Sequence, residues 1–184
     1  MIAINVTPTE KELFDFNYYT SWKAPWNKKK KISWYARVML YTVVGLAIFF
    51  YIVNAKLTWE AAISGVAVLT IYFGIIVPFY IKYRYQKTVK KFYKDPKNEN
   101  IVLPNQIIIN ENGIFTRDSA SETTYKWNAI VRKSVYNGCT YLYLSNVQAL
   151  IIPDRVFTGK DEKEEFEKMI VSQLLLKATL SDLK

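Results

Sequence analysis

Two apolar runs, separated by a very short polar break, constrain this chain more than any other feature of its sequence. The first covers residues 34–53 and is uncharged from Val38 onward, and the second covers residues 61–81 without a charged residue. An α-helix rises about 1.5 Å per residue, so about 20 residues cross a hydrocarbon core of about 30 Å. Both runs reach that length, and neither has the polar stripe of a helix buried in a small soluble protein. The sequence therefore predicts two transmembrane helices, at about residues 34–53 and 60–81.

The basic residues of the chain flank these two runs. The formal net charge is +9, and the excess lies within residues 1–96, because residues 97–184 contain equal numbers of basic and acidic side chains. Basic residues near the ends of transmembrane helices stay on the cytoplasmic side. We therefore expect a multi-pass protein of the cell (inner) membrane with both termini cytoplasmic and a tight turn outside. The membrane-surface basic residues predicted in this way are Lys28, Lys29, Lys30, Lys31, Lys82, Arg84, Lys90 and Lys91.

The lysine run at residues 28–31 has two interpretations. Basic runs often bind nucleic acid, but this run directly precedes a predicted transmembrane helix. Anionic lipid headgroups attract each basic residue near the surface by about 1 kcal/mol, which accounts for the run without a nucleic acid. Aromatic residues at the same helix end, including Trp22 and Trp34, suit the headgroup level. We expect anionic membrane lipids as partners and no nucleic acid.

Residues 1–31 are predicted to form a cytoplasmic segment with a short strand and a helix. Residues 2–6 alternate apolar and polar, as a half-buried strand does. Thr7 and Glu10 are spaced as a capping box, with Pro8 at the first helical position, which predicts a helix over residues 8–21. Its aromatic face could lie on the membrane surface or pack on the C-terminal domain, and the sequence leaves both open.

A turn-rich break at residues 95–100 precedes a predicted C-terminal domain, residues 97–184. Short strands with short links are predicted at residues 106–110, 113–117, 122–127, 131–136, 139–144 and 147–152. Asn137-Gly138 is the strongest hairpin signal among the links. Thr158 is predicted to cap a helix that ends near residue 179. Strands in series form an antiparallel meander, so the predicted fold is a membrane α-helical hairpin plus a small α+β cytoplasmic domain.

Several short segments are each weak signals of a protein family, but the order in which they follow one another along the chain is a more specific signal. They are residues 9–19, the turn at 112–114, residues 125–130 with Trp127 three positions before Ile130, and residues 149–157. In this order they resemble the YcxB-like protein family of small bacterial membrane proteins. The resemblance implies two adjacent transmembrane helices and a cytoplasmic domain similar to bacterial pleckstrin-homology-like modules, with a bent antiparallel sheet closed by the C-terminal helix. It implies no biochemical activity and names no site.

The sequence offers little catalytic chemistry. It contains no His, the commonest general base near neutral pH and the commonest metal ligand. Its one Cys, Cys139, falls within a predicted strand, where a buried structural thiol is the simplest interpretation. No Gly-rich phosphate-binding loop is present, and the acids at residues 161–167 interleave with lysines as on a solvated helix face. We therefore predict that the chain is not an enzyme and takes no cofactor or metal.

Four residues are candidates for contact with a protein partner, and each has a simpler structural interpretation. Asp154 and Arg155 could form a binding corner or a local ion pair. Trp127 could contact a partner or anchor the core of the sheet. Glu60, near the predicted outer turn, could meet an external partner or serve as an interfacial polar residue.

Two functions from different classes fit these features. The first is a membrane-anchored interaction or regulatory protein that acts through its cytoplasmic domain and an unidentified protein partner. The second is an immunity-type protein that protects its producer from a membrane-acting bacteriocin or secreted toxin. A transporter is disfavoured, because neither predicted membrane helix carries a buried charge or a polar stripe. The oligomeric state stays open, and a homo-oligomer is compatible with the sequence.

Overall fold

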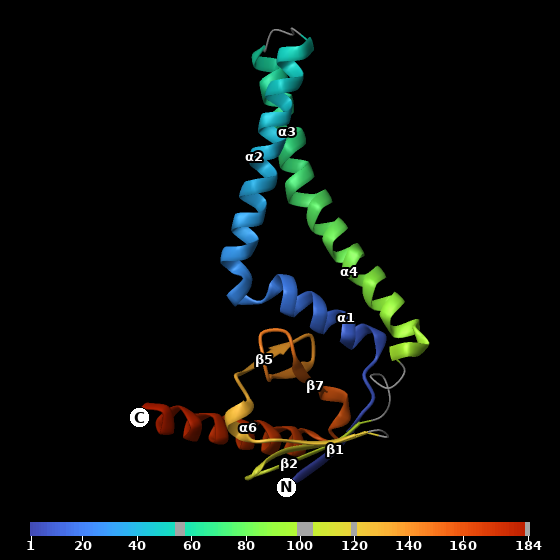
Figure 1. The fold of residues 1–184 in the computed structure, drawn as a ribbon, viewed down its shortest axis with the longest axis vertical. Coiled ribbons are helices and arrows are strands. Elements are labelled where there is room, and N and C mark those ends of the chain that lie inside the picture. Colours follow the sequence, from blue (N-terminus) through green and yellow to red (C-terminus); the bar gives the residue numbers. More distant parts are fainter. Residues whose placement is uncertain (54–57, 99–104, 119–120, 183–184) are drawn as a thin grey trace. The chain divides into compact units, whose positions relative to one another are not determined.

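The computed structural model describes residues 1–53, 58–98, 105–118 and 121–182, and these residues form two compact units (Figure 1). The first, here called the head unit, consists of residues 1–20 and 88–184. The second, here called the helical unit, consists of residues 21–87. The head unit therefore takes in residues 1–20, here called the N-terminal arm, in addition to the predicted C-terminal domain. The sequence left open whether this arm packs on that domain, and the structure shows that it does.

The helical unit consists of long helices. The first is α2 (Lys28–Val53), and the second begins as α3 (Trp59–Ile71) and continues through a π-helical turn (Tyr72–Ile76) into α4 (Val77–Lys94). Residues 88–94 of α4 are counted with the head unit. Asn54 and Thr58, in the polar break between the apolar runs, are predicted from the sequence to cap the two helix ends at the turn. Thr58 does cap α3, because its side chain accepts a hydrogen bond from the Ala61 backbone N–H. The other predicted cap, Asn54, lies outside the described residues.

The π-helical turn has a local cause in the sequence. Pro78 lacks the backbone N–H that would bond the Gly74 carbonyl in a regular α-helix. The Val77 N–H instead donates to the Tyr72 carbonyl, five residues earlier. Such a bulge keeps the helix continuous where proline would otherwise break its hydrogen-bond ladder.

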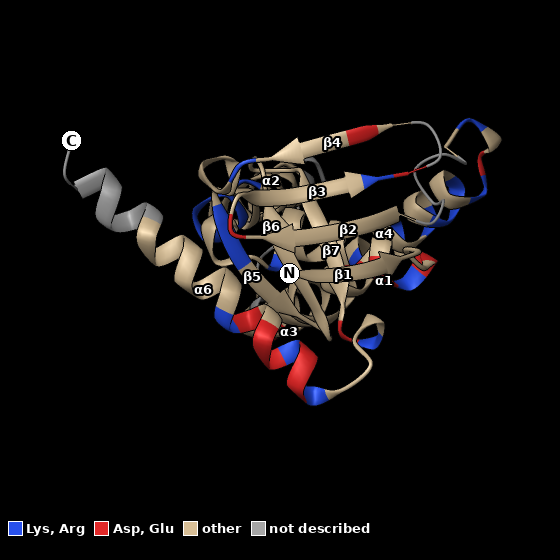
Figure 2. Ribbon diagram, turned by 90° about the horizontal axis from the view of Figure 1, so that it is seen from below, with Lys and Arg blue, Asp and Glu red and all other residues tan. Residues whose placement is uncertain are grey.

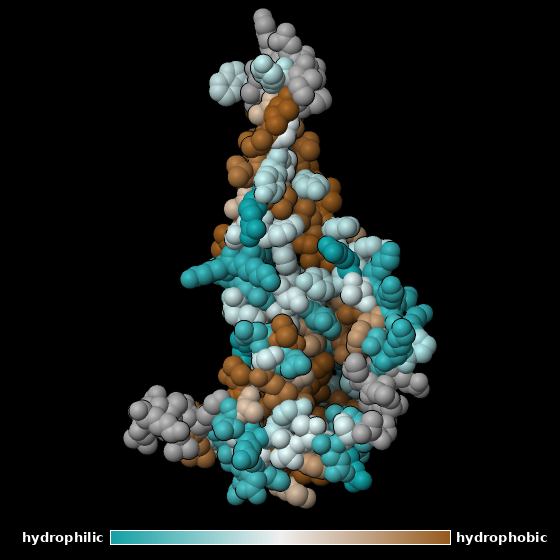
Figure 3. Space-filling model, in the orientation of Figure 1, coloured by the Kyte–Doolittle hydropathy of each residue, from teal (hydrophilic) through white to brown (hydrophobic). Residues whose placement is uncertain are grey.

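Across the described residues, one helix is long and apolar enough to cross a membrane, namely Trp59–Lys94. Little of its apolar stretch is buried within the protein, and Figure 3 shows hydrophobic side chains covering much of the helical unit. This agrees with a membrane location. A second span in α2, the hairpin and its topology stay predictions.

The head unit contains two antiparallel sheets. In the first, β1 (Ile2–Val6), β2 (Asn105–Asn110), β3 (Gly113–Arg117) and β4 (Glu122–Tyr125) lie in that order. In the second, β5 (Arg132–Tyr136), β6 (Cys139–Tyr143) and β7 (Ala149–Pro153) form a meander. The chain closes with α6 (Lys160–Asp182). The predicted α+β class with a C-terminal helix is thus confirmed.

The single meander predicted from the sequence is wrong, because the strand series divides at Trp127. Strand β4 ends at Tyr125, and residues Trp127–Ala129 form a 3₁₀ turn where the prediction had the strand continue. The turn directs the indole ring into the core, where its Nε1–H donates to the Asn110 carbonyl at 3.0 Å. The chain then enters the second sheet at Arg132.

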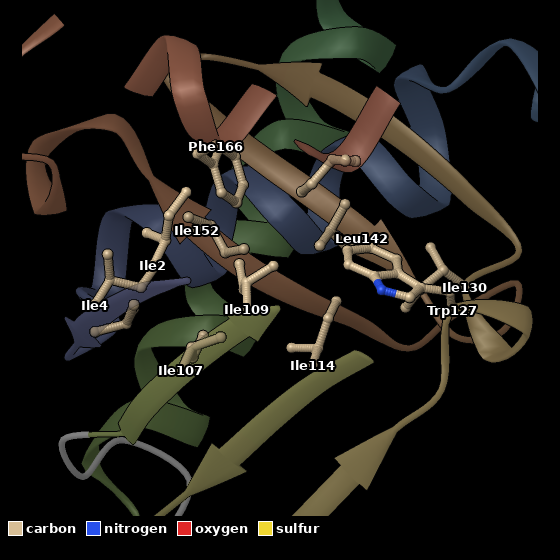
Figure 4. Packing of buried hydrophobic residues seen from close by; sticks show 12 residues of the cluster. Ile2, Ile4, Ile107, Ile109, Ile114, Trp127, Ile130, Leu142, Ile152 and Phe166 are labelled. Carbon is tan, nitrogen blue, oxygen red and sulfur yellow. The ribbon is translucent and has the colours of Figure 1, made fainter. Parts of the chain in front are cut away.

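The core lies between the two sheets and α6 (Figure 4). Alternate residues of β1, namely Ile2, Ile4 and Val6, are buried, as its period-two pattern predicts. Strand β1 aligns with β2 so that Ile2 lies opposite Ile109. From the helix, Phe166 and Ile170 are fully buried, one helical turn apart.

Asn137 and Gly138 form the predicted hairpin turn between β5 and β6. Their φ angles are 48° and 72°, which is the left-handed pair of a type I′ turn. The carbonyl of Gly138 also accepts a hydrogen bond from the Asp154 N–H at 2.8 Å, so this turn is tied to the end of β7.

The predicted capping box at Thr7 and Glu10 is wrong by two residues. The helix α1 (Glu10–Tyr18) is capped by Thr9, whose side chain accepts from the Glu12 N–H while Glu12 accepts from the Thr9 N–H. Both spacings fit the motif, and a distant residue selects between them. With the helix beginning at Glu10, Arg155 binds both the Glu12 carboxylate and the Thr7 carbonyl.

Candidate functional site

Arg155 joins the N-terminal arm to the end of β7. Its Nε donates to Glu12 Oε1 at 2.7 Å and its Nη2 to Glu12 Oε2 at 2.9 Å, a bidentate pair. The same Nη2 donates to the Thr7 carbonyl at 2.7 Å. The Arg155 side chain is 50% exposed and that of Glu12 is 12% exposed. The predicted contact residue Arg155 therefore binds within the chain, to a residue 143 positions away.

The electrostatics of Glu12 follow from this geometry. Burial acts to raise the pKa of the Glu12 carboxyl, but the hydrogen bonds from Arg155 and Thr9 outweigh it and hold the pKa below its ordinary value. The same hydrogen bond raises the pKa of the Arg155 guanidinium. Glu12 is therefore ionised at neutral pH, and the pair is a charged one.

Asp154 makes the adjacent connection, to α6. Its Oδ2 accepts from Lys163 Nζ at 2.7 Å, and this hydrogen bond raises the pKa of the lysine ammonium. Together, Asp154 and Arg155 tie α6, the β5–β6 turn and the N-terminal arm to the end of β7. These internal contacts of Asp154 and Arg155 are here called the β7 junction, and contact of the two residues with a protein partner stays a prediction.

The helix α1 covers one face of the second sheet. Cys139, Tyr141 and Tyr143 alternate along β6 and point to this face. Aromatic rings from the arm pack against them, with Phe16 at 5.4 Å from Tyr141 between ring centroids and Tyr19 at 5.9 Å. This cover explains why every residue of β6 is buried, since its other face contributes Leu142 to the core.

Polar groups fix the position of the arm on this aromatic face. The hydroxyls of Thr20 and Tyr143 share a hydrogen bond of 2.7 Å that is buried. Asn137 Nδ2 donates to Asp15 Oδ1 at 3.2 Å, which connects α1 to the hairpin turn. Tyr19 also stacks on Tyr136 at 4.7 Å. Directional contacts of this kind specify one register of helix against sheet.

Cys139 is closed to solvent beneath α1. Burial, with a contribution from the nearby Glu12 charge, raises the pKa of its thiol to about 11. The thiol is therefore protonated at neutral pH, and a protonated, buried thiol is a poor nucleophile. Within the described ranges, no group of three or more Cys, Asp or Glu residues could hold a metal ion.

The other candidate contact residues lie apart from the β7 junction. Trp127 is 8% exposed and packs in the core cluster. Glu60 lies in the first turn of α3, where it is exposed. The structure therefore brings together Asp154 and Arg155 but neither of the other two.

The basic residues predicted at the membrane surface belong to α2 and α4, and their place at a membrane surface stays a prediction. Lys28 to Lys31 begin α2, and Lys31 Nζ lies over the Trp22 ring at 5.4 Å from its centroid. Trp22 packs edge-on against Trp34 at 5.6 Å. Lys82, Arg84, Lys90 and Lys91 are exposed along α4.

The residues that sequence reasoning missed are in the N-terminal arm. Glu12, Phe16 and Tyr19 contact residues more than 100 positions away, and nothing local to them names a partner. The available signal was the alternation of apolar and polar residues at positions 2–6, which predicts a half-buried strand. Such a strand needs a neighbouring strand to pair with, but the pattern does not say which one.

The architecture defines the head unit as an α+β module built from two antiparallel sheets and a closing helix. Residues 109–170 match the family model described as YcxB-like protein, so the resemblance found in the sequence is confirmed over this segment. The match begins in β2 and ends in α6, and it leaves out the N-terminal arm and the helical unit. No curated protein and no solved structure matches the chain.

Proposed function

We propose that this chain is a membrane-anchored, non-enzymatic interaction or regulatory protein that acts through its head unit. The observation that carries the proposal is the apolar surface of the helix Trp59–Lys94. Large apolar side chains are exposed along its first half, namely Ile63, Val66, Val68, Ile71, Tyr72, Ile75, Ile76 and Phe79. An apolar surface of this extent is unstable in water, whereas a bilayer about 30 Å thick accommodates it.

The helix α2 is proposed as the second span. Its 26 residues extend about 39 Å, and its exposed apolar residues include Met39, Leu40, Val43, Val44 and Ile48. The cluster of Trp22, Lys31 and Trp34 suits the lipid headgroup level at the cytoplasmic end. In this proposal both chain termini are cytoplasmic and Glu60 lies at the outer turn.

The head unit is proposed to be the part that binds a protein partner. The N-terminal arm supplies a strand and a helix to it, so the first and last parts of the chain fold as one module beside the membrane. The likeness to a pleckstrin-homology-like domain is part of this proposal, and such modules act by binding. The charged residues of the β7 junction serve this fold by holding the arm in place.

Cysteine accessibility in intact cells tests the topology. In a Cys139→Ala background, we expect a reagent that does not cross membranes to label Glu60→Cys from outside. Lys11→Cys and Lys97→Cys should react after the cells are opened. Labelling of Lys97→Cys in intact cells would contradict the proposed topology.

Site-specific photo-crosslinking in intact membranes separates the two functions. A regulatory protein should capture a cytoplasmic protein from probes at Lys11 or Lys126 on the head unit. An immunity-type protein should instead capture a secreted peptide from a probe at Trp59, which is 84% exposed. Capture at Trp59 alone would replace the regulatory proposal by the immunity one.

A further inference from the structure

The second half of α4 presents four lysines on one side of the helix. Lys87, Lys90, Lys91 and Lys94 follow the spacing i, i+3, i+4 and i+7, which places their side chains on a single face. All four are exposed, and they belong to the basic colouring of α4 in Figure 2. We call these four residues the lysine face.

The opposite side of the same helix is turned inward. Val89 is 4% exposed and Tyr93 is half-buried, and at about 100° per residue they point about 150° and about 110° away from the centre of the lysine face. The helix therefore presents the lysines to solvent in a defined direction. The four lysines of this face have no ring among them, and an exposed ring on the same side is Tyr83, four residues before Lys87, beside Arg84.

The charge of the lysine face is not balanced along its own helix. The helix α4 contains no acidic residue, so the neighbours of each lysine at i+3 and i+4 within this face are other lysines, whose like charges repel. In α6, by contrast, Lys168 pairs with Glu164 and Lys163 with Asp154. The ion pairs found among the described residues involve none of the four lysines. The helix dipole favours cations in the last turn, which accounts for Lys91 and Lys94 alone.

Lipid phosphates lie too far along the helix to balance the far end of this face. The apolar stretch ends at Ile81, and at about 1.5 Å per residue Lys90 lies about 13 Å beyond it and Lys94 about 20 Å beyond it. The headgroup region extends about 5–8 Å past the hydrocarbon core, and the Debye length is about 8 Å. Lys82 and Arg84 fall within the headgroup region, whereas Lys94 lies beyond it by more than a Debye length at the usual helix tilt of about 20°.

We propose that the lysine face binds an acidic helix of a partner protein, an inference that rests on the proposed membrane anchoring. The four lysines span two helical turns, about 10 Å, which matches Asp or Glu residues at the same spacing on a facing helix. Lysine ammonium groups act as point charges toward carboxylates. Single-stranded nucleic acid would need rings for base stacking, and the four lysines have none among them.

The test uses the full chain reconstituted in nanodiscs of phosphatidylcholine. The probe is a fluorescent peptide of 20 residues with Glu at i, i+3, i+4 and i+7, and its binding is followed by anisotropy at low salt. Three quadruple variants are compared with the wild type, and every lysine that they alter is exposed except Lys31, which is half-buried. They are Lys87/Lys90/Lys91/Lys94→Gln, the same four residues →Arg, and the matched control Lys28/Lys29/Lys30/Lys31→Gln.

The proposal expects the wild type, the Arg variant and the control to bind within threefold of one another. It expects the Gln variant of the lysine face to lose at least tenfold in affinity. No binding by the wild type, or an equal loss in the control, would overturn it.

Two further arms examine the alternative anions. A ten-nucleotide uridine oligomer that binds more tightly than the peptide would overturn the proposal in favour of RNA. Nanodiscs containing phosphatidylglycerol should leave peptide binding unchanged, and suppression by this lipid would show that headgroups occupy the face. Co-elution of the chain with nanodiscs reports membrane anchoring separately, so failure of the anchor and failure of the peptide to bind are distinguishable.

Discussion

Replacing Arg155 by Ala tests whether the N-terminal arm is held by the β7 junction. The substitution removes the bidentate pair with Glu12 and the hydrogen bond to the Thr7 carbonyl. It also leaves the Glu12 carboxylate, which is 12% exposed, without its counter-ion. We therefore expect a lower free energy of unfolding and faster amide exchange in residues 2–18.

The magnitude follows from the exposure of the two partners. An ion pair exposed on both sides is worth about 0.2–1 kcal/mol, and a hydrogen bond to a charged group about 1.5–3 kcal/mol when it is buried. The Arg155 side chain is 50% exposed, whereas that of Glu12 is largely buried. The expected coupling energy between the two residues therefore lies between these limits, at about 1–2 kcal/mol. The loss of the Thr7 contact brings the total for Arg155→Ala to about 2–3 kcal/mol.

The assay is urea unfolding of the full chain in mild detergent, as a double-mutant cycle of Arg155→Ala and Glu12→Gln. The chain offers a matched control in Arg117 and Glu122, which lie 2.9 Å apart with 62% and 55% exposure. The control cycle should give less than about 0.5 kcal/mol of coupling. Equal coupling energies in the two cycles would refute the reasoning that burial and bidentate geometry strengthen the Arg155 pair.

The remaining predictions concern pH and individual side chains. The folded pKa of Glu12 lies below its ordinary value, so the ionised carboxylate stabilises the folded state at pH values above the ordinary pKa. This stabilisation should be lost as the pH falls through the folded pKa. Urea midpoints should therefore fall less between pH 7 and pH 3 in Glu12→Gln than in the wild type. Trp127→Ala should lower the free energy of unfolding by about 3–5 kcal/mol and reduce the amount of folded protein. Cys139→Ser should leave any cellular phenotype intact. Loss of the phenotype in Cys139→Ser at normal protein abundance would reveal a missed chemical site. Tyr143→Phe should cost about 1 kcal/mol in the same urea assay through its bond to Thr20, and no loss would contradict a packed N-terminal arm.

Local features of the head unit could be predicted from the sequence. The bounds of β3 are as predicted, and the Asn137-Gly138 hairpin forms because its left-handed φ angles are a property of those two residues. The spacing of Phe166 and Ile170, four residues apart in α6, likewise puts both on one face of the helix, and this face lies on the core.

Features that depend on distant residues could not be predicted. Two overlapping capping boxes fit the sequence equally, and Arg155, far along the chain, selects the one at Thr9. The pairing of β1 with β2 joins segments separated by the whole helical unit. The sequence singles out Asp154 and Arg155 as a binding corner or a local ion pair, but their partners on α6 and α1 are set by tertiary packing.

A disulfide formed in membranes tests the central claim most directly, namely that the N-terminal arm and the C-terminal segment form one head beside the bilayer. Ala3 on β1 lies opposite Ile108 on β2, and paired Cα atoms of about 4.5–5.5 Å suit a disulfide. In alkaline-washed membranes, with Cys139→Ala as background, Ala3→Cys with Ile108→Cys should give an intramolecular link, detected by mass spectrometry. Ala3→Cys with Phe115→Cys, one strand further away, should not. Absence of the first link, or loss of the protein from the washed membranes, would contradict the account.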